Sequence, residues 1–197
     1  MKKYILHRSI ILLYLAFILT LFTACKTSKV DNKISAKDLV TLESLSEKND
    51  YYIEINVAYP FMTLATSQTT NFLMRNTGNT ANRIEVSGDG NFIEIKNDSV
   101  KGYLPFFGER RLNAGSYGGT DTSIQFEEPL NDLSKVINTS KGKLELEFTA
   151  RQKGDANERY QITLDIFPNK KVTVDIRPIA KTLMRYDGQL TESSIDE

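Results

Sequence analysis

The sequence predicts a mainly β fold: an antiparallel meander closed as a small barrel, with a two-sheet β-sandwich as the alternative, and one N-terminal α-helix. Three segments carry this prediction, because apolar and polar side chains alternate along residues 144–149, 162–166 and 172–176. Alternation with a period of two places one face of a strand in the core and the other in water. The turns between these segments are short, and sequential strands with short connections favour the barrel.

Residues 1–24 predict a secretory signal peptide. Lys2, Lys3 and Arg8 form a basic head, and a 14-residue apolar run extends from Ser9 to Phe22. A basic head, an apolar run and small residues before a cleavage point are typical of such signals. The run is shorter than the roughly 20 residues that a membrane-spanning helix needs.

Cys25 is the only cysteine and follows the small residues Thr23 and Ala24. This pattern resembles a bacterial lipobox, in which the cysteine thiol is acylated and the chain is cut before it. We therefore expect Cys25 to be the mature N-terminus, with palmitate and other acyl chains that anchor it in a membrane. The alternative is an ordinary secreted protein with a free thiol, which is a liability in an oxidising compartment.

Removal of the signal leaves 173 residues, with 22 basic and 25 acidic side chains. This length suits one domain with its own apolar core. No basic run exceeds two residues, so the sequence predicts no nucleic-acid partner. The only histidine, His7, lies in the signal peptide. A mature chain without histidine or free thiol excludes Ser-His-Asp and Cys-His catalysis and the usual zinc ligands. We expect no enzyme, no metal and no cofactor.

The mature chain divides into a lipidated N-terminus and tether at 25–35, one all-β domain at 36–190 and a tail at 191–197. The tether is polar and lacks periodicity. Ser35 is suited to cap a helix over about 36–48, in which leucines recur at near-helical spacing.

The first strands are less uniform than the last ones. Alternation over 51–60 predicts a strand that ends at a proline, and 72–75 predicts a short strand. Two further runs, 83–86 and 91–96, flank the turn sequence 87–90, which contains Asp-Gly. Asp-Gly between alternating runs predicts a β-hairpin.

A strand over 100–104 is followed by Pro105, Phe106 and Phe107. Neighbouring strand residues point to opposite faces, and proline removes a ladder donor. We therefore expect the chain to leave the sheet here and to bury one of the two rings. The glycines of 115–119 predict a mobile loop.

The later part of the domain adds a strand over 123–127 and a last strand over about 182–190. On the strands between these two, four carboxylates occupy positions that face outward. Paired acids could perform hydrolysis, but a solvated sheet face accounts for the same pattern. The four are Glu145, Glu147, Asp165 and Asp175.

Three motifs resemble the domain-of-unknown-function 4251 family, lipoproteins of Bacteroides-type bacteria, over about residues 36–190. They are the box Gly102-Tyr103-Leu104-Pro105-Phe106-Phe107-Gly108, a Gly-Gly followed by Ile124-x-Phe126, and the tail Lys181-x-x-Met184-x-Tyr186-x-Gly188-x-Leu190. Phe106 stands where the family commonly has tyrosine. The resemblance implies an architecture and an envelope location, and it implies no activity.

Lys26 follows the lipidated cysteine, where aspartate is linked with inner-membrane retention in enteric bacteria. No acidic run follows, whereas such a run resembles the surface-export tag of Bacteroides-type bacteria. These features favour an outer-membrane lipoprotein that faces the periplasm.

Two classes of function follow. In the first, the protein is a binding module in which Tyr103, Phe106, Phe107 and Tyr117 form the mouth of a pocket for a small apolar ligand, a lipid or an envelope metabolite. Aromatic rings packed in an ordinary core are the alternative for these residues. In the second class, the domain docks on another envelope protein, through an exposed apolar patch or an open sheet edge.

Ser99 is a candidate for O-glycosylation. Asp98-Ser99-Val100 resembles the Asp-Ser/Thr-apolar acceptor of Bacteroides-type bacteria. A plain turn between two strands is the alternative for this segment.

Overall fold

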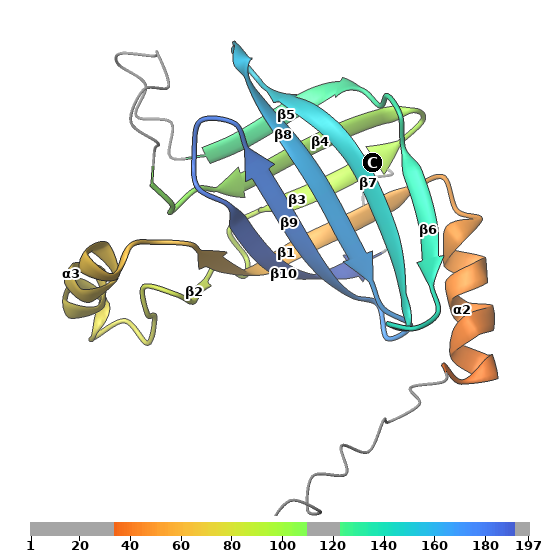
Figure 1. The fold of residues 1–197 in the computed structure, drawn as a ribbon, viewed down its shortest axis with the longest axis horizontal. Helices are drawn as coiled ribbons and strands as arrows, with labels where there is room; N and C mark the ends of the chain where they lie inside the picture. Colours follow the sequence, from red (N-terminus) through yellow and green to blue (C-terminus); the bar gives the residue numbers. More distant parts are fainter. Residues whose placement is uncertain (1–33, 110–122, 192–197) are drawn as a thin grey trace, which may run out of the picture. The chain divides into compact units, whose positions relative to one another are not determined.

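A computed structural model describes residues 34–109 and 123–191, which belong to one compact unit. It confirms the mainly β prediction: the described residues form ten strands in one antiparallel sheet, together with two helices (Figure 1). Neither of these helices has the length and apolarity needed to cross a membrane.

The helices are α2 (Ala36–Ser46) and α3 (Leu64–Met74). The strands are β1 (Tyr51–Pro60), β2 (Ile84–Glu85), β3 (Phe92–Lys96), β4 (Ser99–Pro105), β5 (Ser123–Pro129), β6 (Ser134–Asn138), β7 (Lys143–Gln152), β8 (Asp155–Ile166), β9 (Lys171–Pro178) and β10 (Met184–Thr191).

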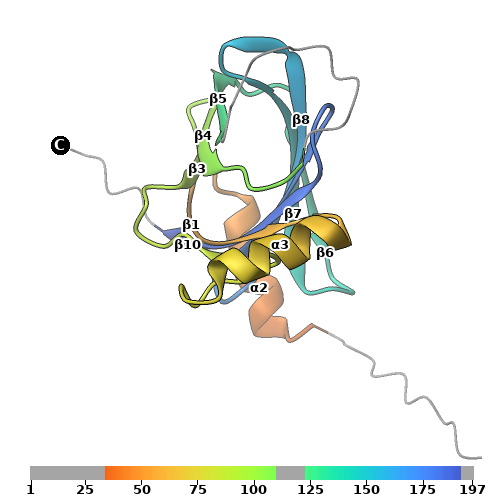
Figure 2. The same cartoon turned by 90° about the vertical axis from the view of Figure 1, so that its left-hand side faces the viewer.

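The sheet has the strand order β5-β4-β3-β1-β10-β9-β8-β7-β6, and β2 pairs with β1. Neighbours in this order are consecutive in sequence except at β1, which lies between β3 and β10. The first and last strands therefore pair, from Tyr52 opposite Thr191 to Pro60 opposite Met184. The result is a meander that curves into a half-barrel (Figure 2).

Contacts join β5, at one end of the sheet, to the hairpin of β7 and β8, which lies next to the other end strand, β6. The backbone N–H of Lys153 donates to the carbonyl oxygen of Gln125 at 2.7 Å. The side-chain oxygen of Gln152, which is buried, accepts from the backbone N–H of Gln125 at 3.1 Å and from the hydroxyl of Tyr160. One buried amide thus links β5 to β7 and to the core ring of Tyr160.

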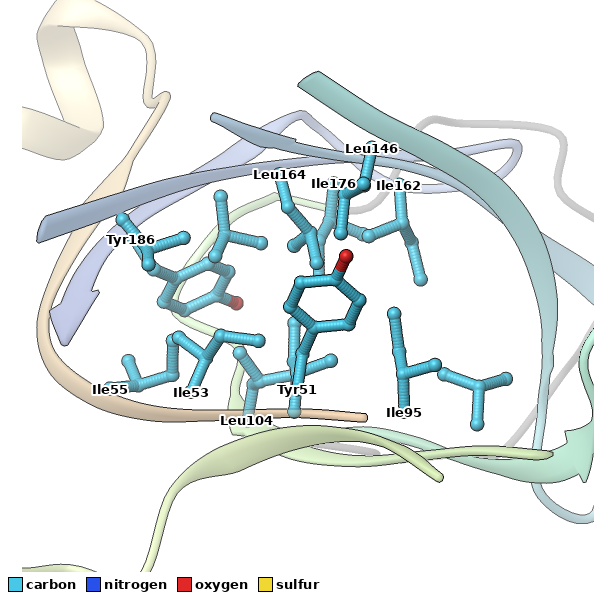
Figure 3. Close-up of a cluster of buried hydrophobic side chains, with 14 of the residues drawn as sticks. Tyr51, Ile53, Ile55, Ile95, Leu104, Leu146, Ile162, Leu164, Ile176 and Tyr186 are labelled. Atoms are coloured by element: carbon cyan, nitrogen blue, oxygen red, sulfur yellow. The ribbon is translucent and has the colours of Figure 1, made fainter. Parts of the chain in front are cut away.

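The interior of the half-barrel is filled with side chains. Ile53, Ile55 and Leu104 on one wall lie opposite Leu164 and Ile176 on the other (Figure 3), and all are fully buried. Alternation puts these residues on the inner face, as the sequence predicts. A small barrel of this kind is a packed core, because its interior is just wide enough for its own side chains.

Helix α2 packs against β6 and β7 through Leu42 and Leu45, as the leucine spacing predicts. The Ser35 side chain accepts from the backbone N–H of Lys37 at 3.3 Å, which confirms the predicted cap. The Tyr51 hydroxyl lies 2.8 Å from the carbonyl oxygen of Leu45 and donates to the C-terminal turn of the helix. The start of β1 thereby holds the end of α2.

Two predictions for the first half are wrong. Residues 72–75 are not a strand, because they belong to the end of α3 and its C-cap. Residues 83–86 and 91–96 do not form a hairpin: β2 and β3 both pair with β1, one after the other. The turn at 87–90, with positive φ at Gly88 and Gly90, carries the chain from one part of β1 to the next. Each of the two runs therefore pairs with β1 and not with the other run, which is the partner that the Asp-Gly turn indicates.

Candidate functional site

The end of β4 separates the aromatic residues that were predicted to border a pocket. Tyr103 is half-exposed on the outer face of β4, whereas Phe106 is buried in the core. Phe107 is partly buried and packs against that core. The prediction that one ring of the pair enters the core is confirmed, whereas Tyr117 and the glycines of 115–119 lie outside the described residues.

Phe106 packs against the connection between β9 and β10. The ammonium of Lys181, which is itself buried, lies 5.0 Å from the centre of the Phe106 ring, so the cation faces the electron-rich ring. The Tyr186 hydroxyl donates to the carbonyl oxygen of Pro105 at 2.8 Å. Burial raises the pKa of Tyr186 well above its ordinary value, so this hydroxyl keeps its proton.

A second pair of hydrogen bonds joins the same two segments. The backbone N–H of Glu109 donates to the Thr182 hydroxyl at 2.9 Å, and the backbone N–H of Thr182 donates to the Glu109 carbonyl at 2.8 Å. A Cβ at Gly108 would lie 2.4 Å from the Thr182 hydroxyl oxygen, so only glycine fits this close approach.

The Glu109 side chain holds the start of α3. One of its carboxylate oxygens accepts from the backbone N–H and the hydroxyl of Thr63, both at 3.1 Å. Hydrogen bonds from Thr66 and Thr63 lower the pKa of Glu109. A negative charge is favourable at the N-terminus of a helix. The helix that the sequence did not predict is therefore anchored to the segment that follows β4.

Helix α3 has two different faces. Ser67, Thr70 and Met74 are partly buried and form its inner face, and Met74 packs against the core. The Asn71 side chain also accepts from the backbone N–H of Ala81 at 2.6 Å, which ties the helix to the loop after it. No residue of α3 is fully buried. The helix is thus held by its polar inner side and its two ends.

The opposite side of this segment carries large apolar side chains in water, which we term the apolar face of α3. Its members and their exposed fractions are Phe61 (52%), Leu64 (76%), Phe72 (62%) and Leu73 (73%). Figure 1 shows α3 at the end of β1 that is remote from α2. Sequence reasoning missed this face. The available signal was an uncharged run from residue 55 to residue 74 in a chain with 25% charged residues.

Three of the four outward carboxylates form ion pairs on the sheet surface, whereas Glu147 accepts a hydrogen bond from the side-chain amide of Gln161. The ammonium of Lys143 lies 2.8 Å from Glu145 and 2.5 Å from Asp165. Burial by itself would lower the pKa of Lys143, but hydrogen bonds to the two carboxylates raise it. Asp175 binds Arg185 at 2.7 Å. Within residues 34–109 and 123–191, no group of three or more histidine, cysteine, aspartate or glutamate side chains is arranged to hold a metal ion.

Both predicted modifications stay predictions, and only one of the two sites, Ser99, lies within the described residues. Ser99 is exposed at the turn between β3 and β4, where Asn97 and Asp98 have positive φ, and its hydroxyl donates to the Lys96 carbonyl at 2.6 Å. A hydroxyl at such a turn is accessible from solvent. Cys25 lies outside the described residues, so its lipidation stays a prediction.

The family model for the domain of unknown function DUF4251 matches residues 33–190, which includes nearly all of the described structure. The chain belongs to the DUF4251 family. Comparison with curated proteins and with solved structures finds no match. In this DUF4251 chain, two of the motifs that carry the resemblance meet in space: Pro105 with Tyr186, Phe106 with Lys181, and the residue after Gly108 with Thr182. These motifs therefore build the junction that supports α3.

Proposed function

We propose that this DUF4251 protein is a lipid-anchored, non-catalytic binding module of the cell envelope that docks on another envelope protein through the apolar face of α3. The observation that carries the proposal is the exposure of Phe61, Leu64, Phe72 and Leu73, each more than half in water. Burying one such side chain is worth about 1.5–3 kcal/mol. A segment that leaves four such side chains in solvent gains most when a partner covers it.

The chemistry of α3 fits a protein surface better than a lipid surface. Helices that lie on membranes are rich in Lys and Arg on the polar face. Helix α3 has neither between Leu64 and Met74, and its polar residues there are Thr, Ser, Gln and Asn. The guanidinium of Arg75, at the C-cap, lies 4.6 Å from the centre of the Phe72 ring. Aromatic residues and Arg are enriched in protein–protein interfaces, whereas Lys and Glu are depleted there. A short exposed helix that presents apolar side chains fits an apolar groove on its partner.

The filled interior supports an outer binding surface. Side chains such as Ile53, Leu104 and Leu164 occupy the half-barrel (Figure 3), where an apolar ligand would otherwise lie. The predicted pocket mouth is also divided, since Tyr103 is outside and Phe106 is in the core. The binding energy must then come from a surface patch, and the apolar face of α3 supplies one.

The anchor completes the proposal. The signal peptide, Cys25 and Lys26 support an outer-membrane lipoprotein whose domain is in the periplasm. Ten residues separate Cys25 from Ala36, the first residue of α2. A chain of that length reaches at most about 40 Å. The docking face would thus operate close to the membrane, and its partner would be another envelope protein within that reach.

A cross-linking experiment in cells tests the docking. A photo-activated amino acid replaces Gln68, which is exposed on α3, in the full-length protein. We expect one cross-linked protein, and we expect Phe72→Ser with Leu73→Ser to abolish it. The matched control is Val40→Ser with Val136→Ser, which removes two exposed apolar side chains on other elements and should leave the cross-link unchanged.

Three results would contradict the docking: cross-links to lipid alone, cross-links to a second copy of this chain, or a protein cross-link that survives the Phe72 and Leu73 changes. The anchor is tested separately with Cys25→Ser, which should abolish palmitate labelling and release the protein from the membrane fraction. Palmitate label that persists on this variant would show that the lipid is attached elsewhere.

A further inference from the structure

A groove of about 700 Å³ opens between the first turns of α2, the turn that joins β8 to β9, and strands β1, β9 and β10. This volume is within the range of about 300–1,000 Å³ that small-molecule sites occupy. Its lining includes no residue of the apolar face of α3, so it is a separate surface.

An irregularity in the sheet builds one wall of the groove. The register of β1 against β10 shifts between Ile55 and Val57, so Asn56 is an extra residue without a partner on β10. Asn56 lines the groove. Beside it, an added Cβ at Gly188 would lie 2.3 Å from the carbonyl oxygen of Glu54, so the two strands approach closely there. Bulges of this kind recur where a sheet directs a side chain at a ligand.

The carboxylate of Asp187 is fixed in the groove by two hydroxyl groups. The Tyr59 hydroxyl donates to one oxygen at 2.9 Å, and the Thr173 hydroxyl donates to the other at 3.1 Å. Burial and the contact with Asp187 raise the pKa of Tyr59, so it remains a donor. An acceptor that is held from both sides binds a ligand hydroxyl at a low cost in side-chain entropy.

The remaining lining determines what class of ligand fits. Lys37 and Lys171 oppose Asp38 and Asp187, so the charges of the groove cancel and favour neither an anion nor a cation. The amides of Asn56 and Gln189 each offer donors and an acceptor. An apolar ligand would leave these groups without partners, which is costly.

One side of the groove is apolar. Phe167 and Pro168, in the turn between β8 and β9, offer flat surfaces that can pack against C–H groups. A neutral molecule with many hydroxyl groups and apolar C–H faces satisfies the amides, the fixed carboxylate and these two rings together. We infer that this groove binds a neutral carbohydrate, as a short oligosaccharide.

Isothermal titration of the domain with maltotriose, cellotriose, mannotriose and chitotriose tests the inference, with inorganic phosphate as a charged comparison. We expect at least one saccharide to bind and phosphate not to bind. Gln189→Ala and Asn56→Ala should each weaken saccharide binding by about tenfold, because each removes a hydrogen-bonding amide. Gln161→Ala, which removes an exposed amide on β8 away from the groove, should bind as the wild type does.

The inference is overturned if none of the four saccharides binds, if the groove variants bind as tightly as the wild type, or if phosphate binds in their place. Thermal melting of each variant confirms that it is folded. The variant with Phe72→Ser and Leu73→Ser should keep its saccharide affinity. Docking through α3 and binding in the groove can therefore fail independently.

Discussion

Large apolar side chains are buried in the half-barrel and exposed on helix α3, although α3 follows strand β1 closely in the chain. Along β1, alternate residues are buried from Tyr51 to Val57, and the pattern resumes with Ala58 and Pro60 after the shift in register. Immediately after β1, Phe61, Leu64, Phe72 and Leu73 lie largely in water. Leu164 is fully buried and Leu73 is mostly exposed. The difference shows that folding stability explains the apolar residues of the half-barrel and does not explain those of α3.

The largest expected difference between the two regions is in the stability cost of truncating a leucine in each of them. Leu164→Ala should lower the free energy of unfolding by about 3 kcal/mol, because it leaves a cavity in a filled core. Leu73→Ala should change it by about 0.5 kcal/mol or less, since little area is buried there. Denaturant unfolding measures both. Equal costs would mean that α3 is packed against the domain in solution and that its apolar face is not free.

Two glycines compare the space for an added side chain between β1 and β10 with the space in the loop after α3. Gly188→Ala should cost about 2 kcal/mol, because its Cβ would lie 2.3 Å from the backbone oxygen of Glu54. Gly78→Ala should cost about 1 kcal/mol, since its φ of 76° strains an alanine but nothing lies within 4 Å of the new atom. Thermal unfolding of both variants gives the order, and a larger loss at Gly78 would contradict the close approach of β1 and β10.

Alkaline pH should weaken the contact between β1 and α2. Burial raises the pKa of Tyr51 to about 12, against an ordinary value of 10.0. Above pH 10.0 the unfolded chain loses this proton while the folded chain keeps it, so stability falls as the pH rises from about 10 to about 12. Below pH 10.0 the contribution of Tyr51 is fully present.

The variant Tyr51→Phe isolates that contribution. At neutral pH it should cost about 1 kcal/mol, because the carbonyl oxygens of Leu45 and Lys48 lose a donor. Its stability should then fall less steeply than that of the wild type at alkaline pH. Unfolding curves at several pH values measure both effects, and identical alkaline slopes would show that Tyr51 ionises equally in both states.

Local patterns predicted the regular parts of the fold well. The alternation in β7, β8 and β9, the cap at Ser35 and the burial of one ring of the Phe106-Phe107 pair follow from rules that act within a few residues. The failures share a different cause. Residues 83–86 and 91–96 are close in sequence, but β1 is a better partner for both than either is for the other. Helix α3 has little apolar periodicity. Such periodicity arises where a helix packs one apolar stripe against the core, and α3 leaves its large apolar side chains exposed.

The amino-acid sequence by itself predicted an antiparallel, mainly β domain, because inward and outward residues alternate along most of its strands, and three of its motifs resemble the DUF4251 family. It also predicts the signal peptide and the lipidated cysteine, which are read from short local motifs. Only the tertiary structure decided that β1 pairs with β10, that Asn56 and Asp187 share a groove, and that the apolar face of α3 is left in solvent. These depend on which distant segments meet, and the period of a strand or helix contains no information about its partner.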